Sequence, residues 1–239
     1  MNIKEKLTIV IPSKNEENYI TNTILSIVNQ RDIKGTRIIV ADAMSTDKTR
    51  SKLITLKHTY KDIVTIEMID GGTVSYARNK ASEMVITKYI LFIDSDAILM
   101  SNTLISDTLK EMEDNSLSLL TCKIKSYGKD IRTTLSFMLF NFVNKIISIK
   151  TPFAVGMFFL TDRDSFRLYG GFDESLAHSE DYFLSKKYFP QNFKISSHYV
   201  GQDDRRFKKM GYLGMIKLLI KGYLNRGNKS FFQKSVNYW

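Results

Sequence analysis

Four short apolar runs recur in the first half of the chain, and none shows the alternation of a half-exposed strand. They are Leu7–Ile11, Thr36–Ala41, Ile63–Ile69 and Tyr89–Ile93. Such runs are typical of parallel strands buried on both faces. Between them, apolar residues follow helical spacing over Glu16–Gln30, Asp47–Tyr60 and Tyr76–Ile86. Strand and helix therefore alternate through roughly the first 115 residues, which predicts a doubly wound, mostly parallel α/β sheet with right-handed crossovers.

The second half of the chain is less regular. Residues 131–149 form a long apolar stretch, which is amphipathic or simply apolar. Phe153–Leu160 and Phe193–Tyr199 predict strands, Glu180–Tyr188 a short helix and Arg205–Asn225 a basic helix. A tail follows whose aromatic residues we expect to be exposed, namely Phe231, Phe232, Tyr238 and Trp239.

Two carboxylates, Asp94 and Asp96, follow the buried run Tyr89–Ile93 directly. Ligands of open α/β sheets lie at the carboxyl ends of strands. Paired acids there are oxygen ligands for a hard divalent cation, which keeps open positions for substrate phosphates. The alternative is an N-cap for a helix over Asn102–Met112, but a cap needs only one acid. The pair therefore favours a metal and phosphate site.

Polar residues also follow the other predicted strands. Pro12 and Glu16 come after the first strand, Asp42 after the second and Arg78 after the third. Because the ends of parallel strands meet at one edge of a sheet, we expect these side chains to line one cleft with the two aspartates.

Each of these residues has a structural alternative. Glu16 can complete a capping box with Ser13. Arg78 can pair with a surface acid, although its place after a glycine-rich turn suits a phosphate. Asp42 has no helix to cap, since the next helix is predicted to start after Ser45, so a functional role is favoured.

Composition narrows the class of protein. With 239 residues, 43% of them hydrophobic, the chain can bury a full core. The single cysteine, Cys122, excludes an intramolecular disulfide and a cysteine-based zinc site, and its apolar surroundings predict a core thiol in a reducing compartment. The N-terminus is too charged for a signal peptide, and no run of about 18 apolar residues suggests a membrane span. We therefore expect a cytoplasmic protein.

Six short motifs stand in one order along the chain: VIPSKNEE, VADAMSTDKT, ARNKA, FIDSDA, GGFDE and HSEDYFLSKK. Their order and spacing resemble a family 2 glycosyltransferase with the GT-A fold, over about residues 7–226. The resemblance implies a hexosyltransferase-type enzyme that moves a sugar, with inversion, from a nucleotide diphosphate donor, most often a UDP-sugar. It also implies Mg2+ or Mn2+ as cofactor. The chain would then be one domain over residues 1–239, with a nucleotide-sugar half to about 115, an acceptor half over about 116–204 and a basic segment over about 205–239.

The resemblance also implies residue roles on the donor side. Pro12, Glu16 and Asp42 match positions that hold the base and ribose, and Arg78 matches one near the diphosphate. Asp94, Ser95 and Asp96 match the metal motif, with Asp96 the direct ligand and Asp94 closer to the ribose or a metal-bound water. Relatives often carry two acids and a glycine where this chain has Asp42-Ala43-Met44, which leaves the base and ribose contacts open.

Other roles concern the chemistry and the acceptor. Asp181, beside Glu180, matches the catalytic base, while Gly156 and Gly170–Phe172 match segments that shape the acceptor side. His198 could be a third metal ligand or a core residue, and His178 is a second candidate. Arg205 and Arg206 match a basic pair that binds phosphate, although a solvated helix start is the alternative.

The net charge of +10 raises the question of partners. Lysines and apolar residues (Leu213, Ile216, Leu219, Ile220 and Leu224) interleave over Lys208–Lys234, a pattern that suits either an anionic membrane surface or a helix packed on the core. Residues 137–149 are a second candidate for lipid contact. Together they suggest a lipid-linked or membrane-proximal glycan acceptor, at the inner face of a membrane.

Several alternatives remain open. A polyprenyl-phosphate sugar transferase differs only in its acceptor. A nucleotidyltransferase would want a glycine-rich loop after the first strand, where this chain has Pro12–Glu16. A nucleic-acid binder would interleave basic and aromatic residues on a sheet face, which the sequence does not do. A non-catalytic nucleotide- or membrane-binding module is the remaining alternative of another class, and the presence of Asp94, Asp96 and Asp181 argues against it.

Overall fold

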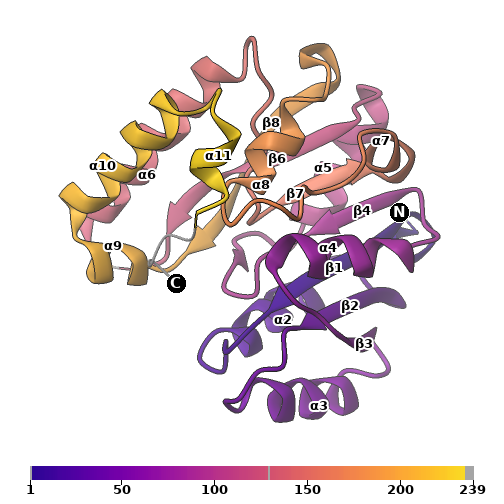
Figure 1. The fold of residues 1–239 in the computed structure, drawn as a ribbon. Coiled ribbons are helices and arrows are strands. Elements are labelled where there is room, and N and C mark those ends of the chain that lie inside the picture. Colours follow the sequence, from indigo (N-terminus) through magenta and orange to yellow (C-terminus); the bar gives the residue numbers. More distant parts are fainter. Residues whose placement is uncertain (1, 129, 235–239) are drawn as a thin grey trace.

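The computed structural model describes residues 2–128 and 130–234 (Figure 1). Its strands are β1 (Leu7–Ser13), β2 (Thr36–Asp42), β3 (Val64–Asp70), β4 (Tyr89–Phe92), β5 (Ile98–Leu99), β6 (Leu119–Ser126), β7 (Phe159–Asp162) and β8 (Phe193–Gln202). The helices are α1 (Ile3–Lys6), α2 (Ile20–Val28), α3 (Thr49–Thr59), α4 (Val74–Glu83), α5 (Leu104–Asp114), α6 (Ile131–Ile147), α7 (Arg163–Leu168), α8 (Glu180–Ser185), the 3-10 turn η1 (Pro190–Asn192), α9 (Arg205–Met210), α10 (Tyr212–Leu224) and α11 (Lys229–Phe232).

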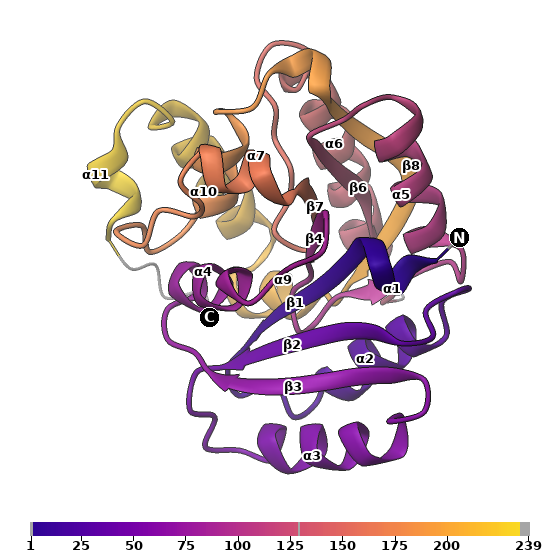
Figure 2. The same cartoon turned by 90° about the vertical axis from the view of Figure 1, so that its right-hand side faces the viewer.

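Within the described residues the strands form one sheet of order β3-β2-β1-β4-β7-β6-β8-β5. The first four of these strands are parallel, as β1 pairs with β2 and β4 and β2 pairs with β3. Strand β7 is antiparallel to both β4 and β6, while β8 runs parallel to β6. Figure 2 shows β1, β2 and β3 side by side at one edge. The predicted α/β sheet, mostly parallel, is confirmed.

Helices cover both faces of this sheet, because its strands bury side chains on both. Along β1, Ile9 and Ile11 join the core that holds α2, α3 and α5, while Val10 joins the core under α4 and α7. Strand β4 divides in the same way, with Leu91 on the first side and Phe92 on the second. The uninterrupted apolar runs of the sequence are thus explained by burial on two faces.

The predicted capping box at Ser13 is wrong. Ser13 is the last residue of β1, and α2 begins only at Ile20. Asn15 between them has a positive φ of 54°, which turns the chain into a loop instead of a helix. Glu16 is therefore free of a capping role and belongs to a loop at the carboxyl end of β1.

The predicted strand Phe153–Leu160 is also wrong over most of its length, since β7 begins at Phe159. Before β7, backbone N–H groups donate to side chains of other elements: Ala154 N donates to Ser185 Oγ, and Val155 N donates to Thr121 Oγ1. These N–H groups are thus engaged by side chains of β6 and α8 and not by a neighbouring strand.

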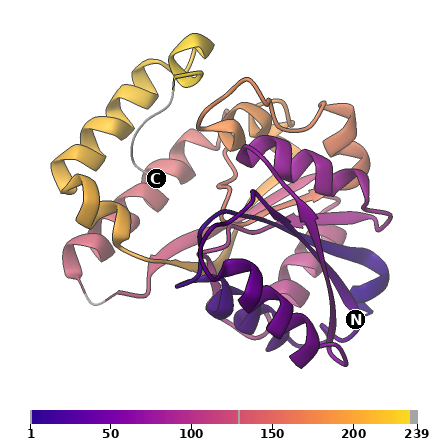
Figure 3. The same cartoon turned by 60° about the horizontal axis from the view of Figure 1, so that its bottom comes forward.

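The predicted basic helix Arg205–Asn225 is divided in two at Gly211. This glycine has a φ of +73°, a conformation that ends α9 and starts α10. Residues with a side chain rarely adopt it. Figures 1 and 3 show α6 and α10 along the flank away from β3. No helix among the described residues combines the length and the apolar character that a bilayer crossing needs.

Two expectations about single side chains have opposite outcomes. Cys122 is buried in β6, so the predicted core thiol is confirmed. Phe232 is buried against Phe183 and His178, which contradicts the expected exposure of the aromatic tail. Its ring packs in a small apolar cluster with Phe183 and Leu176, which the sequence does not reveal. Tyr238 and Trp239 lie outside the described residues.

Candidate active site

The loops that follow β1 and β2 are joined by side-chain hydrogen bonds. Three consecutive backbone N–H groups, those of residues 15 to 17, donate to acceptors on the second loop and at the start of α3. These acceptors are Ser45 Oγ at 2.8 Å, Thr49 Oγ1 at 2.8 Å and Asp47 Oδ2 at 3.1 Å. The position of Glu16 is therefore fixed by the neighbouring loop.

Asp42 at the end of β2 organises the second loop. Its side chain is fully buried and accepts hydrogen bonds from the Ser45 N–H at 3.0 Å and the Ser45 hydroxyl at 2.6 Å. Arg50 lies 3.5 Å away and supplies a positive charge. Pro12 is buried in β1 opposite Ala41 of β2. Pro12 and Asp42, two of the residues predicted to hold the nucleotide, therefore lie at the ends of adjacent strands.

Arg205 joins Glu16 to Asp96 across the top of the sheet. Its guanidinium donates to both carboxylate oxygens of Glu16, at 2.8 and 2.9 Å, and to Asp96 Oδ2 at 2.7 Å. It also stacks 4.3 Å from the centroid of Tyr19, a contact that no pattern in the sequence indicates. Residues 189 positions apart thus form one charged cluster, with Arg205 as its centre.

Burial sets the acidity of this cluster. It raises the pKa of Glu16, against the lowering effect of Arg205. It raises the pKa of Asp96 as well, and the neighbouring charge of Asp94 adds to the rise, while Arg206 and Arg205 oppose it. Ser95 between the two aspartates is buried, and its carbonyl accepts a 2.7 Å hydrogen bond from Thr23. The turn that carries Asp94 and Asp96 is thus held by a hydrogen bond to α2. The charged form of Asp96 is stabilised by the neighbouring arginines.

Arg78 joins the end of β4 to α8. It is buried, and its Nη2 donates to Asp94 Oδ1 at 2.6 Å while its Nη1 donates to Glu180 Oε1 at 2.6 Å. Its guanidinium lies 5.0 Å from the centroid of Phe172. Burial alone would lower the pKa of Arg78, but the two carboxylates raise it. The structure therefore places Arg78 as an internal link between Asp94 and Glu180; its contact with a diphosphate remains a prediction.

Asp181 stands at the start of α8 beside Glu180. Its Oδ2 accepts from the Gly156 N–H at 2.8 Å and its Oδ1 from the Tyr182 N–H at 2.7 Å. Burial raises the pKa of Asp181 to about 7, and the charge of Glu180 contributes, while Arg78 works in the opposite direction. A carboxyl with a pKa near neutrality, oriented by backbone donors, is suited to take a proton.

Gly156 makes room for this arrangement. A Cβ built on it would lie 2.7 Å from Arg78 Nη2, while its N–H holds Asp181. We expect Gly156→Ala to lower the free energy of unfolding by about 1–3 kcal/mol, the range for an overpacked core. Urea unfolding measures the loss. The matched control is Gly222→Ala in α10, where nothing lies near the added Cβ and the change should be neutral or stabilising. Equal effects of the two substitutions would contradict the role of Gly156.

Asn79, next to Arg78 on α4, holds the segment Gly171–Phe172, whose role on the acceptor side stays a prediction. Its Nδ2 donates to the Phe172 carbonyl at 2.8 Å, and its Oδ1 accepts from the Phe172 N–H at 2.9 Å. A Cβ on Gly171 would lie 2.8 Å from Asn79 Oδ1, so this position requires glycine. The sequence places Asn79 in the same motif as Arg78 but does not reveal this partner.

The predicted metal ligands are not gathered into a larger cluster. Over residues 2–128 and 130–234, no group of three or more His, Cys, Asp or Glu side chains could hold a metal ion. The Nε2 of His198 lies 3.2 Å from Asp107 of α5, and His178 is packed against Phe232. Asp94 and Asp96 supply hard oxygen atoms just beyond the end of β4. This fits Mg2+ or Mn2+, which bind through one or two carboxylates together with substrate phosphates.

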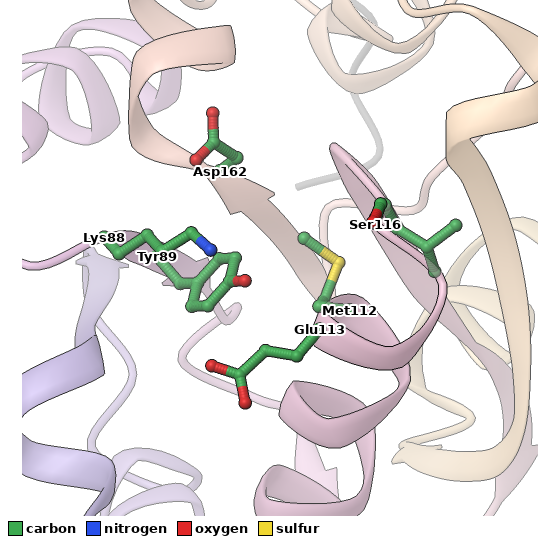
Figure 4. Close-up of a pocket in the computed structure, with 7 residues that line it drawn as sticks. Lys88, Tyr89, Met112, Glu113, Ser116 and Asp162 are labelled. Carbon is green, nitrogen blue, oxygen red and sulfur yellow. The ribbon is translucent and has the colours of Figure 1, made fainter.

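A separate pocket of about 220 Å3 lies at the other end of β4 (Figure 4). Lys88 and Tyr89 line it where β4 begins, together with Glu113 of α5 and Asp162 of β7. Asp94 follows the opposite end of the same strand. None of the predicted site residues lines this pocket, so we do not assign the chemistry to it.

Comparison with known families gives a match to the model of glycosyl transferase family 2 over residues 8–170. Among curated proteins, the chain is 37% identical over 102 residues to a poly(ribitol-phosphate) β-glucosyltransferase of Bacillus spizizenii, a match that covers 42% of this chain and 16% of that protein. It is 28% identical over 180 residues to the UDP-Glc:α-D-GlcNAc-diphosphoundecaprenol β-1,3-glucosyltransferase of Escherichia coli, which covers 74% of this chain and 67% of the relative.

Among solved structures, the fold matches a mannosyltransferase of Pyrobaculum calidifontis in complex with GDP-Man and Mn2+. The TM-score is 0.68 at 17% identity, over 92% of this chain and 65% of that one. At this identity the likeness concerns the fold alone, and it confirms the predicted GT-A architecture.

Proposed function

The chain belongs to glycosyl transferase family 2, and we propose that it transfers a sugar from a nucleoside diphosphate donor to a hydroxyl of a glycan, with inversion. One observation carries the proposal: buried Arg78 ties Asp94, at the end of β4, to Glu180, the neighbour of Asp181. A candidate donor site and a candidate base are thus held together by direct contacts. A non-catalytic module would have no need for a carboxyl whose pKa is raised to about 7 at this place.

Asp181 acts as the base in this proposal. As the acceptor hydroxyl attacks the sugar, its proton passes to the Asp181 carboxylate, and the bond between sugar and diphosphate breaks. The N–H groups of Gly156 and Tyr182 fix the direction of the carboxylate. Glu180 does not accept the proton: its carboxylate is engaged by Arg78, and its charge keeps the pKa of Asp181 high.

The donor would lie over the carboxyl ends of β1, β2 and β4. Pro12, Glu16 and Asp42 border the place of base and ribose, and Asp94 with Ser95 borders the sugar-diphosphate. Mg2+ or Mn2+, when bound, would neutralise charge on the departing diphosphate. Asp96 would hold it directly, with Asp94 nearby; His198 stays a prediction as third ligand, now with Asp107 beside it.

Arg205 donates to Glu16 and to Asp96 Oδ2 in their present arrangement, so a metal held through that oxygen would displace Arg205 from Asp96. Arg205 and the adjacent Arg206 would then bind the phosphates, to which a guanidinium can donate two parallel hydrogen bonds.

The acceptor is proposed to be a lipid-linked or cell-surface glycan, with the enzyme in the cytoplasm at the inner face of a membrane. The names of the Bacillus spizizenii and Escherichia coli relatives, a polymer of ribitol phosphate and a diphosphoundecaprenol, support this class. The Escherichia coli name also supports a UDP-sugar as donor. Transfer to polyprenyl phosphate is the alternative, and an assay that offers a phosphate and a hydroxyl acceptor side by side distinguishes the two.

A thermal-shift screen tests the donor site. We expect one of UDP, GDP, TDP and CDP to raise the melting temperature only with Mn2+, because a ligand that binds the folded state at a hundred times its Kd adds about 2.7 kcal/mol. Asp96→Ala, compared with its own ligand-free melting temperature, should lose that shift. Asp114→Ala, an exposed acid at the end of α5, should retain it. A folded protein that responds to no nucleotide would contradict the proposal.

A further inference from the structure

An uncovered apolar stripe runs along α6. The side chains that form it are between 42% and 72% exposed: Ile131, Leu135, Met138, Leu139, Phe142, Val143, Ile146 and Ile149. From Ile131 to Ile146 their spacing repeats every three or four residues, so these side chains lie on one face of the helix, and Ile149 follows just beyond its end. The opposite face buries Thr133, Phe137 and Asn144. A soluble protein rarely leaves so long an apolar strip exposed without an interaction partner.

Helix α10 extends this stripe. Leu213, Ile220 and Leu224 are 74%, 54% and 71% exposed. The two helices are in contact where they begin, because the Tyr212 hydroxyl lies 2.8 Å from Thr133 Oγ1, and Figures 1 and 3 show them along the same flank. We call these exposed apolar residues, from Ile131 to Ile149 and from Leu213 to Leu224, the α6–α10 face. The side chains of Ile216 and Leu219, named above on sequence grounds, lie outside the described part.

The positive charge of the chain is concentrated on the same flank. Residues 131–150 and 205–234 contain twelve Lys and Arg and no Asp or Glu. The whole chain has 35 basic and 25 acidic residues, so the rest of it holds twenty-three against twenty-five and is nearly neutral. Exposed basic side chains stand on the helices of the face or just beyond their ends, namely Lys145, Lys150, Lys217, Lys221 and Arg226.

We propose that the α6–α10 face docks on an anionic lipid bilayer. Its apolar side chains would enter the interface between headgroups and acyl chains, while its lysines meet the negative headgroups. Charge decides between this occupant and a second copy of the chain, since two such flanks placed together would bring many like charges into one interface. An anionic bilayer matches both the apolar and the basic part of the face.

The face lies close to the candidate active site. Phe137 of α6 packs against Phe207, with 5.5 Å between the ring centroids. Phe207 follows Arg205 by two residues. One turn further along α6, Phe140 contacts Phe153, which in turn contacts Tyr182, the neighbour of Asp181. A docked protein would therefore keep Asp181 near the bilayer surface. This last step rests on the proposed function, whereas membrane binding itself does not.

Co-sedimentation with vesicles tests the proposal. We expect the whole chain to bind vesicles that contain phosphatidylglycerol at least tenfold more strongly than vesicles of phosphatidylcholine alone, and to be released by salt. Leu139→Glu with Phe142→Glu should weaken binding at least tenfold, and so should Lys217→Glu with Lys221→Glu. Matched controls are Ile86→Glu, at a side chain 83% exposed elsewhere, and Lys57→Glu with Lys61→Glu on the far side of the chain, which should bind as the unchanged protein does.

Three outcomes would overturn the proposal. One is no binding to either vesicle, and another is equal loss in the face variants and the controls. The third is a dimer, found by sedimentation without lipid, that Leu139→Glu with Phe142→Glu converts to a monomer, since the face would then belong to a second copy. Asp181→Asn should bind vesicles normally, so a failure of the proposed chemistry and a failure of docking are told apart.

Discussion

Asp181→Asn is expected to lower the rate of sugar transfer by about 10²- to 10⁴-fold, the range that a positioned general base contributes. The amide keeps the shape of the side chain and can still accept the N–H of Gly156, but it cannot take the acceptor proton. Radiolabelled sugar transfer measures the rate, and the nucleotide-dependent thermal shift should remain, because Asp181 is not among the proposed donor residues.

Asp164→Asn is the matched control for this substitution. Asp164 lies on α7, is 78% exposed and pairs only locally with Arg163 at 3.2 Å. It should transfer sugar at the rate of the unchanged enzyme. A transfer rate in Asp181→Asn within threefold of the unchanged enzyme would assign the proton to another group.

The pH dependence of the transfer rate is a second test of Asp181 as the base. A base works only when deprotonated, so the rate should rise as pH rises through about 7, the raised pKa of Asp181, and should fall below it. An aspartate at its ordinary pKa would give a flat profile between about pH 5 and 8. Glu180→Gln removes a like charge beside Asp181, so the acid limb should move to lower pH.

The sequence predicts the part of the site that lies at the carboxyl ends of the strands. Uninterrupted apolar runs locate β1, β2 and β4, and the parallel order of these strands brings Glu16, Asp42 and Asp96 to one edge. That step needs only the period of the pattern and the direction of the strands. The family resemblance adds Asp181, which no periodicity would have indicated.

The pairing of charges could not be predicted in the same way. Arg205 meets Glu16 across 189 residues and Arg78 meets Glu180 across 102, and neither pair has a local signal. Arg78 illustrates the limit, since the same guanidinium beside a glycine-rich turn suits a phosphate or two buried carboxylates equally well. Its two carboxylate partners come from the structure alone, and its contact with a diphosphate stays a prediction.

Irregular backbone marks a second limit. The apolar run Phe153–Leu160 has strand character in its side chains, yet Thr121, Asp181 and Ser185 take its early N–H groups. This non-strand segment then presents the N–H of Gly156 to Asp181. The departure from the predicted strand therefore lies at the candidate active site itself. In a regular strand ladder the Gly156 N–H would not be available to Asp181.

Arg78→Met is expected to lower the free energy of unfolding by about 3–5 kcal/mol, the cost of breaking a buried ion pair from one side. Methionine keeps much of the volume but leaves Asp94 and Glu180 without their shared partner, both at 2.6 Å from the guanidinium. Urea unfolding, followed by circular dichroism, measures the loss at neutral pH.

Arg37→Met separates this effect from the loss of any ion-paired arginine. Arg37 also pairs with a carboxylate at 2.6 Å, that of Glu67, but both side chains are partly exposed, at 27% and 35%. Water can solvate the remaining acid there, so a loss of about 1 kcal/mol or less is expected. If both variants lose the same amount, Arg78 is an ordinary ion pair and the link between β4 and α8 lies elsewhere. A loss confined to Arg78→Met would mean that the buried guanidinium holds the donor side and the base in one frame, which is what the proposed transfer requires of it.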